Sequence, residues 1–388
     1  MKARYMIMSL VLTAGLVLGM SAKAYANSPQ LSVDAKSAVL LEPETGKILF
    51  EKNPDERLSP ASVTKVMTMY LIYQALEQGR IKLDDVVTVS DHAARMGGSQ
   101  IYLEPMEKQS VRDLLKAVVI ASANDAAVAL AEFIGGSEES FVDMMNQTAK
   151  DLELTNSQFK NACGLDSDGH YMSARDIAVL TKELINRHPE VFDYTGVWMD
   201  SITHHTARGS SEFGLTNTNK LIKWYNGATG LKTGSTSQAL YCLSGTATRD
   251  NLSLVAVVLA SPSPAVRFQE VMKMFDYGFA NYKLVAGDEP GMVAGAVRVT
   301  KGQTDIIPVK IGTRVSAVVP KGAAGAVTSE TRLDRAVSAP VSAGQKLGEV
   351  HYKYGDMELG CSDVVAANDI AKASFFDTLK MMHKHWFK

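Results

Sequence analysis

A hydroxyl and an amine that could act together lie three residues apart in this sequence, at Ser62 and Lys65. Ser59 is a favoured N-cap residue and Pro60 a favoured first helical residue, so the sequence predicts a helix that begins here. Residues three apart share a helix face, which makes Lys65 a candidate base for a nucleophilic Ser62. In the first turn the N–H of Ser62 has no acceptor within the helix, so it could donate to an oxyanion.

The residues that follow Lys65, from 66 to 73, are apolar on nearly every side of the predicted helix. Such a helix is buried inside a domain, and burial lowers the pKa of a lysine and so favours its neutral, basic form. The chain contains a second Ser-x-x-Lys pattern, at Ser157 and Lys160, in a polar stretch typical of turn and strand. Because this second pattern has no helix start, we interpret it as a coincidence.

A second pair of chemical groups, Ser122 and Asn124, lies between two predicted helices. Ser110 caps the first of these helices, which runs to residue 120, and Asn124 with Asp125 caps the second, which runs to residue 134. A hydroxyl and an amide at such a corner can face one cleft, where the hydroxyl relays a proton and the amide orients a substrate carbonyl. Alternatively, Ser122 and Asn124 only cap the second helix.

A third group, Lys232, Thr233 and Gly234, lies on a predicted strand that two more strands follow, at residues 239–245 and 252–259. The last two flank a turn, so the pattern predicts adjacent antiparallel strands. On an edge strand the lysine and the threonine would offer a cation and a hydroxyl to an anionic substrate, and the glycine allows close backbone approach. Alternatively, Lys-Thr-Gly is an ordinary strand end.

The three motifs occur in a fixed order, with 60 residues from Ser62 to Ser122 and 110 from Ser122 to Lys232. The chain resembles the serine penicillin-recognising enzymes, whose motif set this is, and among them the low-molecular-mass penicillin-binding proteins that act as D-alanyl-D-alanine carboxypeptidases. The resemblance covers roughly residues 30 to 370. It implies an α/β (α+β) domain of the serine β-lactamase/DD-peptidase type, with an antiparallel sheet flanked by helices, and a small all-β C-terminal domain.

The resemblance also implies roles for the catalytic groups. Ser62 would attack the carbonyl of the penultimate D-alanine, Lys65 would take its proton, and the terminal D-alanine would leave from an acyl-enzyme. Ser122 would pass a proton to the leaving amine. Asn124 would hold the peptide and the groups around Lys65.

The remaining implied roles concern substrate binding. Lys232, Thr233 and Thr236 would bind the terminal carboxylate, a role that suits their charge and hydroxyls. The N–H groups of Ser62 and Ser235, the residue after the glycine of Lys-Thr-Gly, would form the oxyanion hole. The implied partners are peptidoglycan stem peptides that end in D-Ala-D-Ala, and β-lactam antibiotics. The resemblance implies no metal and no cofactor.

One departure separates this chain from class A β-lactamases, which carry a glutamate in a Glu-x-x-Leu-Asn pattern that activates the deacylating water. The corresponding segment here is Gln158-Phe159-Lys160-Asn161, and the nearby Glu153 has the wrong spacing. We therefore expect penicillins to acylate Ser62 and to remain bound. The alternatives are a β-lactamase, a DD-transpeptidase, and a non-catalytic protein that senses β-lactams or binds the wall.

The two ends of the chain predict export and a membrane contact. Residues 1–26 have the charge pattern, apolar core and small-x-small site of a secretory signal peptide. Residues 27–285 would form the catalytic domain, 286–368 a valine-rich β domain, and 369–388 an amphipathic helix suited to a membrane interface. Its apolar stripe comprises Ala371, Phe375, Leu379, Met382 and Trp386. The predicted location is the outer face of the bacterial cytoplasmic membrane or the cell wall.

Other features exclude several classes of function. With 40 Lys and Arg against 42 Asp and Glu, the chain has no basic footprint for nucleic acid. The three cysteines, Cys163, Cys242 and Cys361, are too few and too scattered for a disulfide framework or a zinc site, and we assign them no chemistry. His170 is a lone histidine in a turn-rich loop, and we interpret it as solvated or as fixing the loop.

Overall fold

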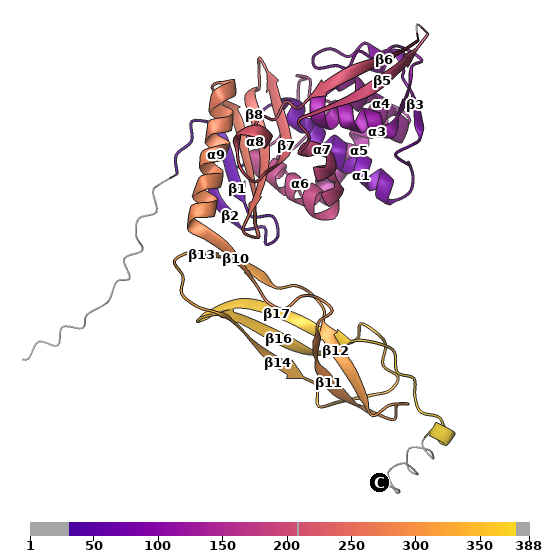
Figure 1. The fold of residues 1–388 in the computed structure, drawn as a ribbon, viewed down its shortest axis with the longest axis vertical. Helices are drawn as coiled ribbons and strands as arrows, with labels where there is room; N and C mark the ends of the chain where they lie inside the picture. The colour runs from indigo at the N-terminus through magenta and orange to yellow at the C-terminus, as the bar shows by residue number, and fades with distance from the viewer. Residues whose placement is uncertain (1–30, 208, 378–388) are drawn as a thin grey trace, which may run out of the picture. The chain divides into compact units, whose positions relative to one another are not determined.

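The computed structural model describes residues 31–207 and 209–377, and its N-terminal part is built on a five-stranded antiparallel sheet (Figure 1). The strand order is β2-β1-β9-β8-β7, so β7 lies at an edge. The antiparallel strands predicted at residues 239–245 and 252–259 are confirmed as β8 and β9, and β1 pairs antiparallel with β2. The strands are β1 (Ser37–Leu41), β2 (Ile48–Lys52), β7 (Ala228–Thr236), β8 (Leu240–Arg249) and β9 (Leu252–Ser261).

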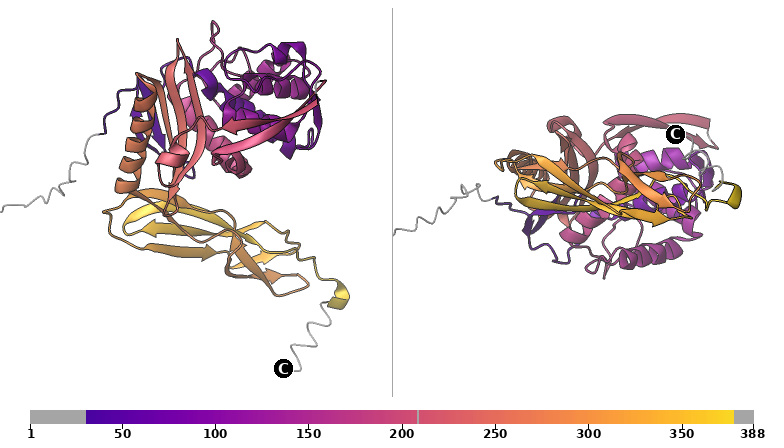
Figure 2. Two further views of the ribbon diagram at one scale, coloured as in Figure 1. Left: turned by 45° about the horizontal axis from the view of Figure 1, so that its top comes forward. Right: turned by 90° about the horizontal axis from the view of Figure 1, so that it is seen from below.

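Helices cover both faces of this sheet. Helix α9 packs along one face, and α6 packs on the other with the remaining long helices beyond it (Figures 1 and 2). The long helices are α1 (Lys65–Glu77), α4 (Asn124–Gly135), α5 (Glu138–Asp151), α6 (Ala174–Arg187) and α9 (Pro264–Asn281).

Shorter elements connect the sheet and the long helices. These are η1 (Ala61–Thr64), β3 (Val86–Thr88), α2 (Asp91–Ala94), β4 (Lys108–Ser110), α3 (Val111–Lys116), η2 (Ala117–Ala121), η3 (Pro189–Val191), α7 (Phe192–Thr195), β5 (Met199–Thr206), β6 (Gly209–Thr216) and α8 (Leu221–Trp224). Two of the sheets outside the main one are hairpin-like pairs, β3 with β4 and β5 with β6.

Helix α1 is buried on nearly every side, as its composition predicted. Every residue from Lys65 to Tyr73 is buried, and the apolar ones belong to one large hydrophobic cluster with α4 and α6. An all-round apolar helix is stable only inside a domain, so the rest of the fold is packed around α1. The start of this helix is therefore fixed in position.

The predicted helix caps are only partly confirmed. The predicted cap at Ser110 is confirmed, since its side chain accepts from the backbone N–H three residues on at the start of α3, and Ser173 caps α6 in the same way. The cap predicted at Asn124 and Asp125 is wrong: the N-cap of α4 is Ala123, which makes no side-chain cap. The Asp125 carboxylate instead accepts from the backbone N–H groups of the preceding loop, at residues 101 and 103.

The predicted start of the Ser62 helix also differs. A 3-10 turn, η1, precedes α1, and its N-cap is Pro60 rather than Ser59. Ser59 does not cap because its hydroxyl donates to Asp166 Oδ1, in a loop distant in sequence. The helix predicted from 111 to 120 changes form within its last turn, since α3 gives way to the π-helical η2.

The C-terminal part of the described chain is all-β, as predicted, and has its own hydrophobic cluster. A six-stranded sheet has the order β14-β16-β17-β12-β11-β15, and β10 pairs with β13. The strands are β10 (Tyr282–Ala286), β11 (Val293–Thr300), β12 (Ile306–Ile311), β13 (Ser316–Pro320), β14 (Val327–Leu333), β15 (Ala336–Ser338), β16 (Lys346–Tyr354) and β17 (Met357–Ala366). The domain boundary between residues 285 and 286, which falls within β10, stays a prediction.

The two predicted terminal segments lie largely outside the described residues. The signal peptide at 1–26 lies wholly outside them, and the C-terminal helix at 369–388 is described only to residue 377. Ser374 and Asp377 each bond the other's backbone N–H through their side chains, a reciprocal pattern typical of a helix start. Within the described ranges, no helix combines the length and the apolar character needed to cross a bilayer.

Candidate active site

Ser62 lies in η1, against the edge strand β7. The backbone of β7 approaches the turn so closely that a Cβ at Gly234 would lie 2.8 Å from Pro60 O and 2.9 Å from Val63 N. Glycine is therefore required at this point of the Lys-Thr-Gly motif. The approach brings the residue after it, Ser235, beside the nucleophile turn.

Lys65 is fully buried, and its Nζ donates to three oxygen atoms. These are Ser62 Oγ at 3.1 Å, Asn124 Oδ1 at 2.6 Å and the carbonyl oxygen of Cys163 at 2.7 Å. Burial lowers the pKa of Lys65 to about 8. None of the three acceptors is a carboxylate, so no hydrogen-bonded anion restores the pKa. Lys65 can therefore exist as a neutral base near neutral pH, within reach of the Ser62 hydroxyl.

Asn124 connects Lys65 to the loop that precedes α3. Its Oδ1 accepts from Lys65 Nζ, while its Nδ2 donates to Gly97 O at 2.6 Å. Its backbone N–H donates to Ser99 O at 2.7 Å. Because the side chain is committed to these contacts, it does not cap α4.

Ser122 ends η2 with a left-handed backbone, at φ 61° and ψ 29°. This conformation is unusual for a residue other than glycine, asparagine or aspartate. The left-handed conformation ends the helix at Ser122. At this point Lys232 Nζ donates to Ser122 Oγ at 2.8 Å, so the serine hydroxyl contacts a second buried lysine. Residues that the sequence places 110 positions apart are thereby in direct contact.

Lys232 is buried on β7 and also donates to the carbonyl oxygen of Thr233 at 3.0 Å. Burial, with the nearby charges of Lys65 and Arg267, holds the pKa of Lys232 well below its usual range. Thr233 Oγ1 donates to Thr218 Oγ1 at 2.7 Å. The site thus contains two lysine–serine pairs, one for each half of an acyl transfer.

The other two predicted residues of this strand differ in their surroundings. Ser235 is exposed, as an N–H donor to a substrate must be. Thr236 Oγ1 donates to Asp166 Oδ1 at 2.8 Å, so its hydroxyl is already engaged. Asp166 Oδ1 also accepts from Ser59 Oγ. Sequence reasoning missed Asp166, because nothing in its loop indicates hydrogen-bond partners before η1 and on β7.

Arg267 of α9 is a second residue that the sequence analysis missed. Its Nη1 donates to the carbonyl oxygen of Gly234 at 3.0 Å, and burial lowers its pKa. The guanidinium lies near the rings of Tyr241 and Phe268. Through its bond to Gly234, Arg267 connects α9 to the edge strand β7. No spacing pattern links it to Lys232, so only the packing of α9 on the sheet could have revealed it.

The loop at residues 161–170 presses against the nucleophile turn. A Cβ at Gly164 would lie 2.0 Å from Ala61 O, and the loop's backbone has φ +86° at this glycine. His170 Nε2 lies 2.9 Å from Thr64 Oγ1, while its Nδ1 accepts from Lys160 N at 3.3 Å. Burial lowers the pKa of His170 to about 4, so the ring is neutral and fixes the loop to η1.

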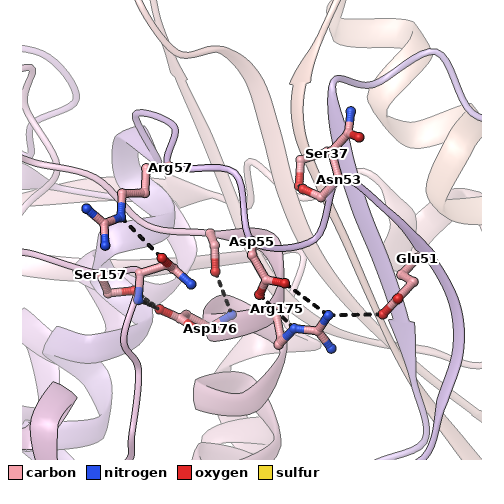
Figure 3. A network of polar contacts seen from close by, with 10 residues as sticks. Ser37, Glu51, Asn53, Asp55, Arg57, Ser157, Arg175 and Asp176 are labelled. Atoms are coloured by element: carbon pink, nitrogen blue, oxygen red, sulfur yellow. Dashed lines mark hydrogen bonds and ion pairs between the residues drawn. The ribbon is translucent and has the colours of Figure 1, made fainter.

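The second Ser-x-x-Lys pattern forms no such pair. The hydroxyl of Ser157 donates to Asp176 Oδ2 at 2.8 Å, beside the ion pair of Arg175 with Asp55 (Figure 3). Cys163 and Cys242 are buried and Cys361 is exposed, and all three are free thiols. Of the three, Cys163 contributes to the site, through its backbone carbonyl.

Comparisons with known proteins identify the family of the chain. A family model described as D-alanyl-D-alanine carboxypeptidase matches residues 22–263, and one described as penicillin-binding protein 5, C-terminal domain, matches 279–372. The chain is 44% identical to the Bacillus subtilis D-alanyl-D-alanine carboxypeptidase DacF, over 92% of each chain, and 35% identical to Escherichia coli DacC, over 92% of this chain and 90% of that one. Penicillin-binding protein 5 of Haemophilus influenzae superposes with a TM-score of 0.72 at 32% identity, covering 88% of this chain and 98% of that one.

The lowered pKa of Lys65 predicts the pH dependence of acylation. A protonated lysine cannot accept the Ser62 proton, so the rate constant for acylation by benzylpenicillin should rise about tenfold per pH unit at low pH and level off above a pH of about 8. Stopped-flow measurement between about pH 5 and pH 10 would show it. Lys65→Arg, which stays charged, should acylate negligibly throughout. A flat profile for the unmodified enzyme would contradict the assignment of Lys65 as the base.

Close approach at Gly234 predicts that Gly234→Ala separates β7 from η1. Acylation should slow by on the order of 100-fold, because small misplacements of reacting groups are costly. Gly214→Ala is the matched control, since a Cβ there meets nothing within 4 Å. Equal acylation rates in the two variants would show that the contact does not set the geometry.

Proposed function

This chain belongs to the D-alanyl-D-alanine carboxypeptidase family, and we propose how its own residues carry out that reaction. The enzyme is a serine hydrolase that removes the terminal D-alanine from peptidoglycan stem peptides. One observation supports the division of roles proposed here. The amino group of each of two buried lysines contacts a serine hydroxyl, Lys65 on Ser62 at 3.1 Å and Lys232 on Ser122 at 2.8 Å.

Acylation begins at Ser62. Its Oγ attacks the carbonyl carbon of the penultimate D-alanine while neutral Lys65 takes the hydroxyl proton. The carbonyl oxygen becomes an oxyanion between the N–H groups of Ser62 and Ser235. Each such donor typically lowers the barrier by roughly 3 kcal/mol.

Departure of the terminal D-alanine needs a proton on its nitrogen. Ser122 donates it, and the ammonium of Lys232 that contacts Ser122 Oγ replaces it. The C–N bond breaks, D-alanine leaves with a neutral amine, and the carbonyl forms again as the Ser62 ester. Asn124 keeps Lys65 and the peptide aligned during both steps, through its contact with Nζ.

Lys232 and Thr233 bind the carboxylate of the terminal D-alanine. A buried ammonium and a hydroxyl on one strand suit an anionic group of this size. Thr236 could reach the same carboxylate only by giving up its hydrogen bond to Asp166. In the proposed mechanism Thr236 keeps this bond, and Lys232 and Thr233 hold the carboxylate.

Water completes the reaction by attacking the Ser62 ester, and Lys65 returns its proton to Ser62 Oγ as the ester bond breaks. The proton of the attacking water passes through Ser122 to Lys232 and restores the ammonium that the first half of the reaction consumed. The acceptors on Lys65 are a hydroxyl, an amide and a carbonyl, and none is a carboxylate base. A penicillin acyl group, which blocks the path of water, should therefore persist on Ser62. This supports a carboxypeptidase inhibited by penicillins rather than a β-lactamase.

The substrate places the enzyme outside the cytoplasm, since peptidoglycan is assembled there. We propose that residues 1–26 direct export and that the C-terminal segment associates with the outer face of the cytoplasmic membrane. In support, Phe375 and Phe376 are 74% and 81% exposed, directly after the helix start at Ser374. Exposed aromatic residues at the start of a helix suit a membrane interface.

Replacing the nucleophile tests the proposed site. Ser62→Ala should lower D-alanine release from a D-Ala-D-Ala peptide by at least about 10⁴-fold, because nothing else can form the ester. It should also abolish covalent labelling by benzylpenicillin. Ser157→Ala, which changes the other Ser-x-x-Lys pattern, should behave like the unmodified enzyme.

Intact mass and product analysis of a soluble form, residues 27–370, separate the alternatives. A stable adduct on Ser62 together with D-alanine release is the expected result. Labelling without release would indicate a sensor or a strict transpeptidase. Hydrolysed penicillin without a lasting adduct would indicate a β-lactamase, and labelling that persists in Ser62→Ala would place the nucleophile elsewhere.

Deletion of residues 371–388 tests the membrane contact. The shortened enzyme should leave the membrane fraction for the soluble fraction while its labelling by fluorescent penicillin stays unchanged. The labelling serves as the internal control for folding. An unchanged membrane fraction would rule out anchoring by this segment.

A further inference from the structure

The carboxylate of Asp166 joins two parts of the active site that are distant in sequence. Its Oδ1 accepts hydrogen bonds from Ser59 Oγ at 3.0 Å and from Thr236 Oγ1 at 2.8 Å. Ser59 lies three residues before Ser62, and Thr236 directly follows Ser235. Asp166 is exposed, like both of these bonds. Bonds from hydroxyls to a carboxylate are charge-assisted and stronger than those between neutral groups, although water screens them at an exposed site.

The hydroxyl of Thr236 is oriented toward this carboxylate by a further contact. Its Oγ1 accepts from the backbone N–H of Ala239 at 2.9 Å. The hydroxyl proton is therefore left for Asp166. On the β7 side the hydrogen bonds therefore run in one direction, from the Ala239 N–H to the Thr236 hydroxyl and from that hydroxyl to the Asp166 carboxylate.

The loop that carries Asp166 is held by hydrogen bonds of its own and by one to a catalytic group. Asn161 Oδ1 accepts from the backbone N–H groups of Gly164 at 2.7 Å and Leu165 at 3.2 Å, and its Nδ2 donates to Leu165 O. The carbonyl oxygen of Cys163 accepts from Lys65 Nζ. A carboxylate on such a loop can hold other elements in place rather than follow them.

The two elements that it joins each supply one proposed donor of the oxyanion hole. Ser62 lies on η1 and Ser235 on β7, and both N–H groups must reach one oxygen atom at about 2.7–3.1 Å. Gly234 prevents the two elements from clashing, but a glycine exerts no attraction. A tie between them is needed to keep the separation constant during the reaction.

We infer that Asp166 is a positioning residue that ties η1 to β7 and so sets the spacing of the two oxyanion-hole N–H groups. It acts through Ser59 and Thr236 and touches no reacting atom. This inference rests on the proposed roles of Ser62 and Ser235. It predicts that Asp166 affects the rates of bond making more than the binding of the peptide.

The first test compares three variants of the full chain. Asp166→Ala should lower kcat for D-alanine release, and the acylation rate constant for benzylpenicillin, about tenfold with KM nearly unchanged. Asp166→Asn keeps an acceptor oxygen and should recover most of the rate. Asp168→Ala removes an exposed carboxylate from the same loop and should match the unmodified enzyme.

A double-mutant cycle tests the route of the effect. Ser59→Ala combined with Thr236→Val removes both hydroxyls that donate to the carboxylate. In that background Asp166→Ala should cost no further rate, because its partners are already gone. A tenfold loss that persists in the background would overturn the inference.

The remaining outcomes are equally decisive. A raised KM with unchanged kcat in Asp166→Ala would make Asp166 a substrate-binding group and overturn the inference. An unaffected rate would overturn it as well. Labelling of Ser62 in the unmodified enzyme is measured first. If that labelling fails, the proposed function is wrong. If Ser62 is labelled but the Asp166→Ala substitution leaves the rates unchanged, only the positioning role is refuted.

Discussion

The burial of two lysine ammonium groups beside two serine hydroxyls is the constraint on which the rest of the structure depends. Removing an ammonium from water is costly, and the cost is met only when its protons find acceptors. Lys65 finds them on η1, at the start of α4 and in the loop at residue 163. Lys232 finds them on Ser122 and on its own strand. Desolvation thus favours the neutral form of each lysine. The hydrogen bonds that compensate for it also hold these segments of the chain together.

The sequence predicted the parts of the site whose signals are local. The spacing of Ser62 and Lys65 and the apolar run after them indicated a buried helix, and α1 is one. Ser59 and Asn124 were misassigned as caps for one physical reason. Each is a good capping residue with a stronger partner far away in the chain, Asp166 for one and Lys65 for the other. Local propensity cannot anticipate a partner that only the tertiary fold supplies.

The same distinction applies to the strands. Alternating apolar residues mark β11 and β16 in the sequence, because one face of each packs on the core of the C-terminal part. Strand β14 carries no such signal, since nearly all its residues are exposed. In β17 the alternation is interrupted by Gly360 and by a register shift beside β16. Pairing with a neighbour, rather than its own pattern, makes each a strand.

Two buried lysines in one cleft also constrain each other. The charge of Lys65 is among the causes that lower the pKa of Lys232, so the state with both lysines protonated is disfavoured. An anionic group bound at Lys232 stabilises the proton there and leaves Lys65 as the group that gives up its own more readily. A ligand with a carboxylate at the β7 end therefore favours the assignment of protons that acylation needs. Recognition of the carboxylate and activation of Ser62 are in this way parts of one electrostatic arrangement.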